Sequence, residues 1–288
     1  MSDQTAGRAP RVDAGTDAAV ALVPQRISAV QRLSRIAVPV AMLLAAILAW
    51  HLLVTIREIP RYILPSPADV AKSLWNDWGT LAPALLVTLR ITFTALILAV
   101  IGGVATAIVL VQSRWIELAL TPYVVILQVT PIIAIAPLLL IYTDTQVALL
   151  ICSYLVAFFP ILSNMLTGLK SVDHNLLNLF DLYGASRWKT LLHLKLPAAM
   201  PYFLTGLRIG GGLALIAAVV AEFAAGSAGA GSGLAFRLLE SGFRLNIPRL
   251  FACLVLLSAT GVAMFGLTSL ISWLALHKWH ESALRREN

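Results

Sequence analysis

Charged residues are scarce in this 288-residue chain. Asp, Glu, Lys and Arg together make up only 12% of it, about half their share in soluble domains, whereas 59% of its residues are hydrophobic. The mean hydropathy of +0.86 excludes an ordinary soluble domain. The chain has only two cysteines, Cys152 and Cys253, and both lie within apolar runs, where small buried side chains are the simplest interpretation. Neither a disulfide framework nor a metal site is indicated.

Long apolar runs take the place of the missing charges. A helix needs about 20 apolar residues to cross about 30 Å of hydrocarbon, because it rises about 1.5 Å per residue and satisfies its own backbone hydrogen bonds. Six runs meet this requirement: 36–54, 91–111, 123–142, 147–169, 202–221 and 251–274. The sequence therefore predicts an all-α membrane protein with about six transmembrane helices, in a single membrane domain over residues 36–275.

Basic residues are unevenly divided between the two sides of these runs. One side, with both termini, carries 13 Lys and Arg residues outside the spans, and the other side carries 6. Because the richer side is retained in the cytoplasm, both termini are expected to be cytoplasmic, and the net charge of +7 reflects topology rather than nucleic-acid binding. Residues 1–35 lack the apolar core of a signal peptide and are expected to be a disordered arm, and 276–288 a cytoplasmic tail.

The first external loop contains a helix-start signal. Ser66 can cap a helix, Pro67 suits the first turn and Asp69 can complete a capping box, so a short helix to about Trp78 is expected. Its tryptophans favour a position at the outer membrane surface. The fifth loop opens with a stretch rich in glycine, alanine and serine, 224–233, which is typical of a linker.

The loop over 170–201 is much longer than the other inner loop. Its apolar residues, from Leu176 to Tyr183 and from Trp188 to Leu194, fit two short helices that meet at Gly184. Such a hairpin is too apolar to be surrounded by water. It needs a surface to bury against, and a soluble partner is the natural candidate.

Several motifs in and around this loop carry a family resemblance. Gly184 is followed 13 residues later by Pro197 in a Leu-Pro pair, then by Pro201 and a Gly-Leu-Arg run at 206–208. With Pro-Ser-Pro at 65–67, Gln-Val-Thr-Pro at 128–131 and Phe-Pro at 159–160, the chain resembles the permeases of binding-protein-dependent ABC importers. The details look closest to the branch for nitrate, taurine, sulfonates, bicarbonate, and pyrimidine or flavin precursors.

The resemblance implies an architecture and a set of partners. It implies the fold of a type I importer permease in a bacterial plasma membrane, working as a symmetric dimer. Two ATP-binding subunits, which hold the ATP and Mg²⁺, and an extracytoplasmic substrate-binding protein would complete the system. The chain itself would carry no cofactor and bind no nucleic acid.

The resemblance also assigns the loop to the ATP-binding subunit. The coupling residues it implies are Asp181, Leu182, Tyr183, Gly184, Ala185, Ser186, Arg187, Leu196 and Pro197. The family's Glu-Ala-Ala is here Asn-Leu-Phe at 178–180, so Asp181 either supplies the acid or the acid is not needed. Pro197 and Pro201 are expected to stop the second helix of the hairpin before the membrane.

The chain is not expected to hydrolyse ATP itself. The run from Gly184 to Thr190 superficially resembles a phosphate-binding loop, but Trp188 replaces the glycine before the lysine and no buried strand precedes it. The hydrolysis is therefore assigned to a separate chain.

Polar residues within the spans are candidates for the transport path. They are Gln128, Thr130, Ser153, Asn164 and Gly211. Hydrogen bonds between helices are the common alternative for the polar side chains, and close packing of helices is the first interpretation of Gly211. Arg90, Arg208 and Glu222 lie near span ends and are interpreted as anchors to headgroups. An ion-coupled secondary transporter and a membrane-embedded enzyme are the alternatives, but neither a mid-membrane proton relay nor a convergent catalytic set is visible. The sequence does not identify the cargo.

Overall fold

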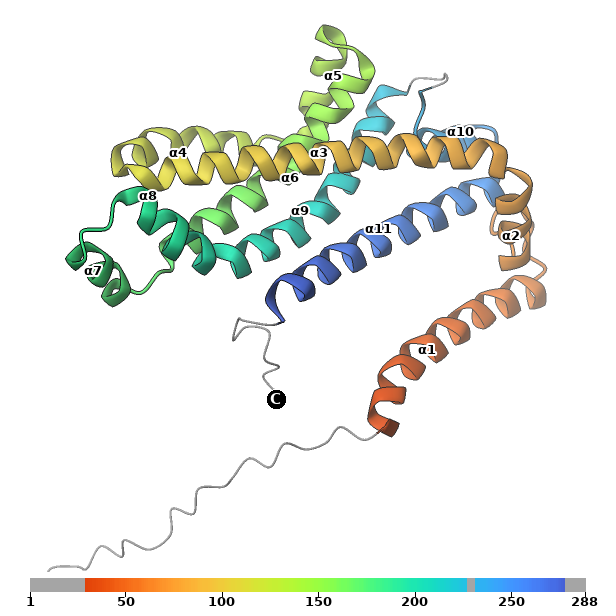
Figure 1. Ribbon diagram of the computed structural model, residues 1–288. Helices are drawn as coiled ribbons and strands as arrows, with labels where there is room; N and C mark the ends of the chain where they lie inside the picture. The colour runs from red at the N-terminus through yellow and green to blue at the C-terminus, as the bar shows by residue number, and fades with distance from the viewer. Residues whose placement is uncertain (1–28, 227–230, 278–288) are drawn as a thin grey trace, which may run out of the picture. The chain divides into compact units, whose positions relative to one another are not determined.

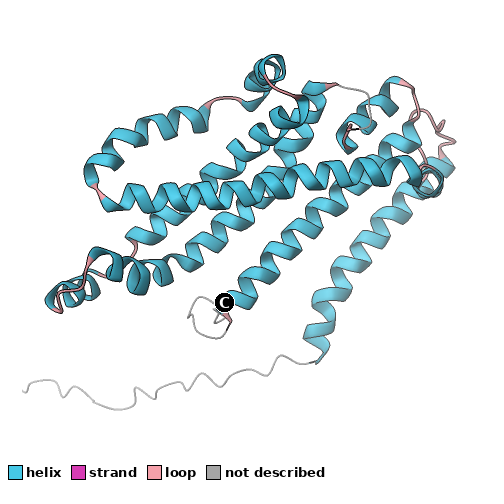
Figure 2. Cartoon of the chain, turned by 45° about the horizontal axis from the view of Figure 1, so that its top comes forward, coloured by secondary structure: helices cyan, strands magenta, loops and turns pink. Residues whose placement is uncertain are grey.

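The computed structural model describes residues 29–226 and 231–277, and every regular element in these ranges is a helix (Figure 1; Figure 2). Within them, five helices are long and apolar enough to cross a membrane, and a bent pair of helices makes a sixth candidate. This confirms the expected all-α fold with about six transmembrane helices. Most of the arm expected over 1–35 and of the tail expected over 276–288 lies outside the described residues.

The chain divides into two compact units, residues 1–49 and 50–288. Helix α1 (Ala29–Ile56) crosses this division, and its candidate membrane span is Ala37–Ile56. The helix begins seven residues before the expected span because polar residues outside the hydrocarbon can continue a helix. Within the larger unit, the ring of Trp50 packs 5.7 Å from the ring of Phe251.

Three long helices form the core of the larger unit: α3 (Trp78–Gln112), α6 (Thr145–Lys170) and α9 (Leu196–Ala225). Glycines bring their backbones together, as is common between membrane helices. A Cβ atom at Gly206 of α9 would lie 2.9 Å from both Asn164 Cβ and the Pro160 carbonyl oxygen of α6. A Cβ at Gly168 of α6 would lie 2.8 Å from the Cα of Ala199. These contacts leave room for hydrogen but not for a methyl group.

The third expected span is broken. Instead of one helix over 123–142, the structure has α4 (Arg114–Val129) and α5 (Ile132–Tyr142), whose axes differ by 98°. The expectation of a continuous helix was wrong, because Pro131 disfavours helical geometry at the preceding residue. Thr130 and Pro131 accordingly both have extended backbone, with ψ of 123° and 120°.

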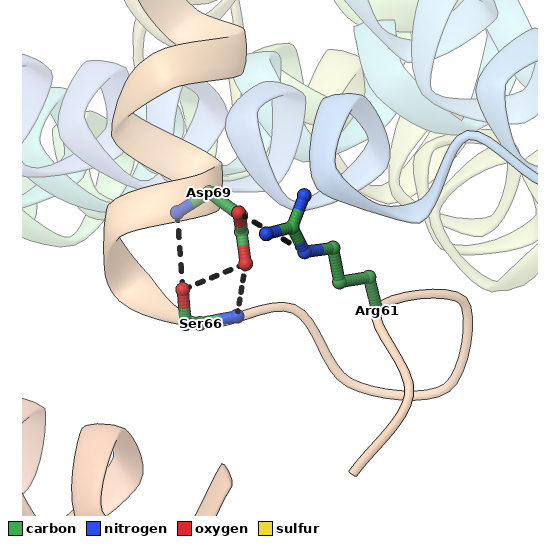
Figure 3. Close-up of polar contacts among 3 residues, drawn as sticks. All are labelled: Arg61, Ser66 and Asp69. Atoms are coloured by element: carbon green, nitrogen blue, oxygen red, sulfur yellow. Dashed lines mark hydrogen bonds and ion pairs between the residues drawn. The ribbon is translucent and has the colours of Figure 1, made fainter. Parts of the chain in front are cut away.

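The predicted capping box is confirmed at the start of α2 (Pro67–Asn76). The Asp69 N–H donates to Ser66 Oγ at 3.2 Å, while the Asp69 carboxylate accepts from the Ser66 hydroxyl at 2.7 Å and from the Ser66 N–H at 3.3 Å (Figure 3). Arg61 Nε lies 3.5 Å from the same carboxylate. The hydrogen bond from the Ser66 hydroxyl, helped by the charge of Arg61, lowers the pKa of Asp69 below its ordinary value. This cap fixes the start of α2.

A helix that the sequence analysis did not anticipate follows the glycine-rich stretch. Helix α10 (Leu234–Phe243) packs against α11 (Ile247–Leu276), α3 and α9. Its outer face carries an ion-pair network in which Glu240 accepts from Arg237 at 2.9 Å and from Arg244 at 2.9 Å. The hydrogen bond from Arg237 is the main reason why the pKa of Glu240 is lowered. Helices α2 and α10 both lie at the end of the core opposite to the loop that contains Gly184 (Figure 1).

Candidate functional site

The loop between α6 and α9 forms the predicted hairpin, with Gly184 at its turn. Its first helix, α7 (His174–Leu182), begins where the side chain of Asp173 accepts from the Asn175 N–H at 2.8 Å. Gly184 has a φ of +65°, a left-handed conformation that glycine adopts without strain, and the next N–H, of Ala185, donates back to the Phe180 carbonyl at 3.0 Å. This arrangement is the Schellman ending of a helix, so the glycine is required by the turn.

The hairpin presents apolar side chains to its surroundings. Leu182 is 84% exposed and Tyr183 is 81% exposed, at the tip where α7 ends. Further along each arm, Leu176, Leu179, Trp188 and Leu192 are also exposed. Exposed apolar surface of this kind is typical of interaction sites.

The second arm of the hairpin runs directly into the fifth span. Ser186 caps α8 (Arg187–Thr190) by accepting from the Lys189 N–H at 3.4 Å, and a π-helical segment, η1 (Leu191–Lys195), joins α8 to α9 without a break. The expectation that Pro197 and Pro201 stop this helix was wrong. Pro197 lies in the first turn of α9, where a missing N–H is tolerated, and the wider π turn before it accommodates the ring.

The nine implied coupling residues fall into three groups. Leu182, Tyr183, Gly184 and Ser186 are exposed at the tip. Asp181, Ala185 and Arg187 line a cavity of about 250 Å³, which Val111, Gln112 and Lys195 also line. Leu196 and Pro197 instead line an apolar cavity of about 670 Å³ between α3, α6 and α9. The hairpin thus has a free apolar tip and a charged inner side that faces the end of α3.

An ion pair joins the base of the hairpin to the start of α4. Lys170, in the last turn of α6, pairs with Glu117, in the first turn of α4. Both residues are partly exposed, so the pair contributes little energy, although it shows that the ends of the two helices lie close together.

Only two of the five candidate path residues come together. Gln128 and Thr130 line a cavity of about 200 Å³ at the break between α4 and α5, with Phe159, Pro160 and Leu213 among its other walls. No charged side chain lines it. The cavity therefore offers amide and hydroxyl groups beside apolar surface.

The other three candidates take part in packing or in hydrogen bonds within their own helix. The Ser153 hydroxyl is buried and donates to the Leu149 carbonyl at 2.9 Å, and the Asn164 amide donates to the Pro160 carbonyl at 2.8 Å. Gly211 is packed against Thr268, with 3.3 Å between a Cβ at that position and Thr268 Cγ2. Gly211 thus fits the packing interpretation, whereas Ser153 and Asn164 make these hydrogen bonds within α6 and not between helices.

The three ionisable residues near span ends differ in their surroundings. Arg90 is exposed, and the guanidinium of Arg208 lies 5.6 Å from the ring centroid of Phe265, on an exposed face of α9. Glu222 is only 2% exposed and is hydrogen-bonded to Thr88 and to the backbone of Ala235. The interpretation of Glu222 as a headgroup anchor was therefore wrong. The available signal was its acidic side chain at the end of a long apolar run, which usually means a specific partner.

Comparison with known proteins identifies the kind of transporter to which these features belong. Residues 99–285 match the family model for the inner membrane component of binding-protein-dependent transport systems. The chain belongs to this family. The permease is 31% identical over 246 residues to a probable ABC transporter permease protein of Haemophilus influenzae, with 85% of this chain and 97% of the relative covered.

Two further relatives have named cargoes. The permease is 31% identical over 270 residues to the riboflavin transport system permease protein of Chloroflexus aurantiacus, covering 91% of this chain and 98% of the relative. It is 33% identical over 192 residues to the taurine transport system permease protein of Escherichia coli, covering 63% and 69%. The resemblance seen in the sequence is confirmed: the chain is a multi-pass permease component of an ABC importer for small solutes and not itself an enzyme. None of these relatives is an ion-coupled secondary transporter.

Proposed function

We propose that the hairpin over 171–195 is the element through which an ATP-binding subunit drives this permease. The observation that carries the proposal is the exposed apolar tip at Leu182 and Tyr183, on a turn that Gly184 holds in shape. Two copies of the permease would bind two ATP-binding subunits, each holding ATP and Mg²⁺. A substrate-binding protein would deliver the solute at the opposite face.

The proposed path passes the break between α4 and α5. Backbone that leaves helical geometry at membrane depth is tolerated where it lines protein or a water-filled cavity, and the cavity at Gln128 and Thr130 provides such a place. Its uncharged walls suit a small solute held by hydrogen bonds and apolar contacts. The riboflavin and taurine relatives support a small organic cargo of this general kind.

The division of labour can be tested by reconstitution. The permease purified alone in liposomes is expected to hydrolyse no ATP, because the chain has no phosphate-binding loop. Hydrolysis should appear when the ATP-binding subunit is added and should rise when the loaded binding protein is supplied. ATP hydrolysis by the isolated permease at the rate of the full complex would overturn the assignment.

The proposed orientation places the hairpin and both termini in the cytoplasm and α10 outside. The uneven distribution of Lys and Arg supports this orientation. Both native cysteines are fully buried, so labels should report only on introduced cysteines. In intact cells, an impermeant maleimide is expected to label Phe243→Cys, whereas Ser186→Cys should react only after the membrane is opened. Labelling of Ser186→Cys alone would reverse the topology.

A further inference from the structure

Glu222 lies at the end of α9 remote from the hairpin and connects three helices there. Its Oε1 accepts from the Thr88 hydroxyl of α3 at 2.8 Å, and its Oε2 accepts from the Ala235 N–H of α10 at 2.9 Å. The Thr88 hydroxyl oxygen in turn accepts from the Leu234 N–H at 2.8 Å. Glu222 is 2% exposed and Thr88 fully buried, and among the described residues no ion pair of Glu222 is found.

These contacts cap α10 from outside its own sequence. The first N–H groups of a helix have no partner within the helix and attract negative charge. The N-cap of α10 is Gly233, which has no side chain to accept them. Glu222 and Thr88 supply the missing acceptors, and a Cβ atom at Gly233 would overlap the Glu222 carboxylate. A buried carboxylate is costly unless it is hydrogen-bonded, and the bonds from Thr88 and Ala235 supply those partners here.

The same helix carries both Glu222 and the second arm of the hairpin. Helices α8, η1 and α9 follow one another without a break from Arg187 to Ala225, and this run is one candidate membrane span. At about 1.5 Å per residue, Arg187 and Glu222 are roughly 50 Å apart along it. One continuous helical run thus connects the second arm of the hairpin to the residue that holds α10.

We propose that Glu222 is a positioning residue that makes α10 follow the hairpin, so that the outer face of the permease responds to the nucleotide state of the ATP-binding subunit. This inference rests on the proposed function, because it takes the hairpin as the point where the subunit acts. It assigns α10 a place in the transport cycle that neither its sequence nor the comparisons provide.

Hydrogen exchange of the permease in complex with its ATP-binding subunit tests the link. In the wild type, Mg²⁺ and a non-hydrolysable ATP analogue are expected to change amide exchange both in the hairpin, over 187–195, and at the start of α10, over 231–243. In Glu222→Ala the nucleotide-dependent change in amide exchange should persist in the hairpin. The corresponding change at the start of α10 should become about tenfold smaller, because the Ala235 N–H loses its acceptor.

Conservative and matched variants separate positioning from mere packing. Glu222→Gln should restore the response of α10, because the amide oxygen of the glutamine can accept from the Ala235 N–H. Its NH₂ group can donate to the Thr88 oxygen. The Thr88 hydroxyl can then donate to the Ala84 carbonyl, which lies 3.3 Å away. Thr88→Val should behave like Glu222→Ala and serves in its place if that variant does not assemble. Thr92→Val is the control, because Thr92 is equally buried one turn away and donates only to the Thr88 carbonyl.

The outcomes distinguish the two proposals. A wild-type hairpin that does not respond to nucleotide would overturn the proposed function and this inference with it. A responsive hairpin with an undiminished α10 response in Glu222→Ala would overturn the inference alone. The inference would also fail if Thr92→Val reduced the response of α10 as much as Thr88→Val does, since both threonines would then serve only to stabilise α3.

Discussion

Replacing both Leu182 and Tyr183 with aspartate is expected to abolish ATP-driven transport without reducing the amount of permease in the membrane. Both side chains are more than four-fifths exposed, so the change removes little packing within the permease. Docking into an apolar groove would instead bury two carboxylates. A cost of about 3 kcal/mol would weaken binding of the ATP-binding subunit roughly 100-fold.

Recovery of the ATP-binding subunit with tagged permease measures this effect directly. Phe243→Asp is the matched control, because Phe243 is a similarly exposed apolar residue and its helix, α10, lies at the opposite end of the core (Figure 1). It should leave recovery unchanged. Normal recovery with the doubly substituted hairpin would show that the ATP-binding subunit attaches elsewhere.

Substitution of Gly206 by leucine is expected to give the largest loss of stability among the glycines of α9. The first added carbon would meet the backbone of α6, at the Pro160 oxygen and the Ile161 Cα, and neither atom can move without displacing the helix. Overfilling such a contact costs about 3 kcal/mol. The thermal midpoint of the purified permease in detergent should fall accordingly.

Gly212 provides the comparison on the same helix. A Cβ atom there has nothing within 4 Å, so Gly212→Leu should leave the midpoint unchanged or raise it slightly through better helix propensity. Equal losses in the two variants would mean that helix propensity or lipid contact, and not the approach of α6, decides the stability of α9.

The parts of the fold that depend on local sequence could be predicted. The apolar runs located the spans because the hydrocarbon imposes their length, and the capping box at Ser66 and Asp69 was readable because all its partners lie within four residues. Gly184 was likewise recognisable as a turn, since only glycine readily adopts its φ of +65°.

The features that were missed depend on partners distant in the chain or on competition between local signals. Glu222 accepts from a threonine 134 residues earlier, which no local pattern reveals. Helix α10 follows a glycine-rich stretch that looks like a linker, and its start is capped by other helices. Pro131 lies at a break, with extended backbone at Thr130 and Pro131, whereas Pro197 lies in the first turn of α9 directly after a π turn and the helix continues through it.

The π turn at Leu191–Lys195 has a consequence for the angular register of α9. Each residue of an α-helix turns the chain by about 100° and advances it by about 1.5 Å, and a π turn holds one extra residue within nearly the same length. Converting η1 to regular α-helix would therefore rotate everything beyond it relative to the hairpin. The Glu222 carboxylate would then point away from the start of α10 while the tip of the hairpin stayed in place. The π turn η1 thus sets the direction in which Glu222 points around the axis of α9, relative to the hairpin.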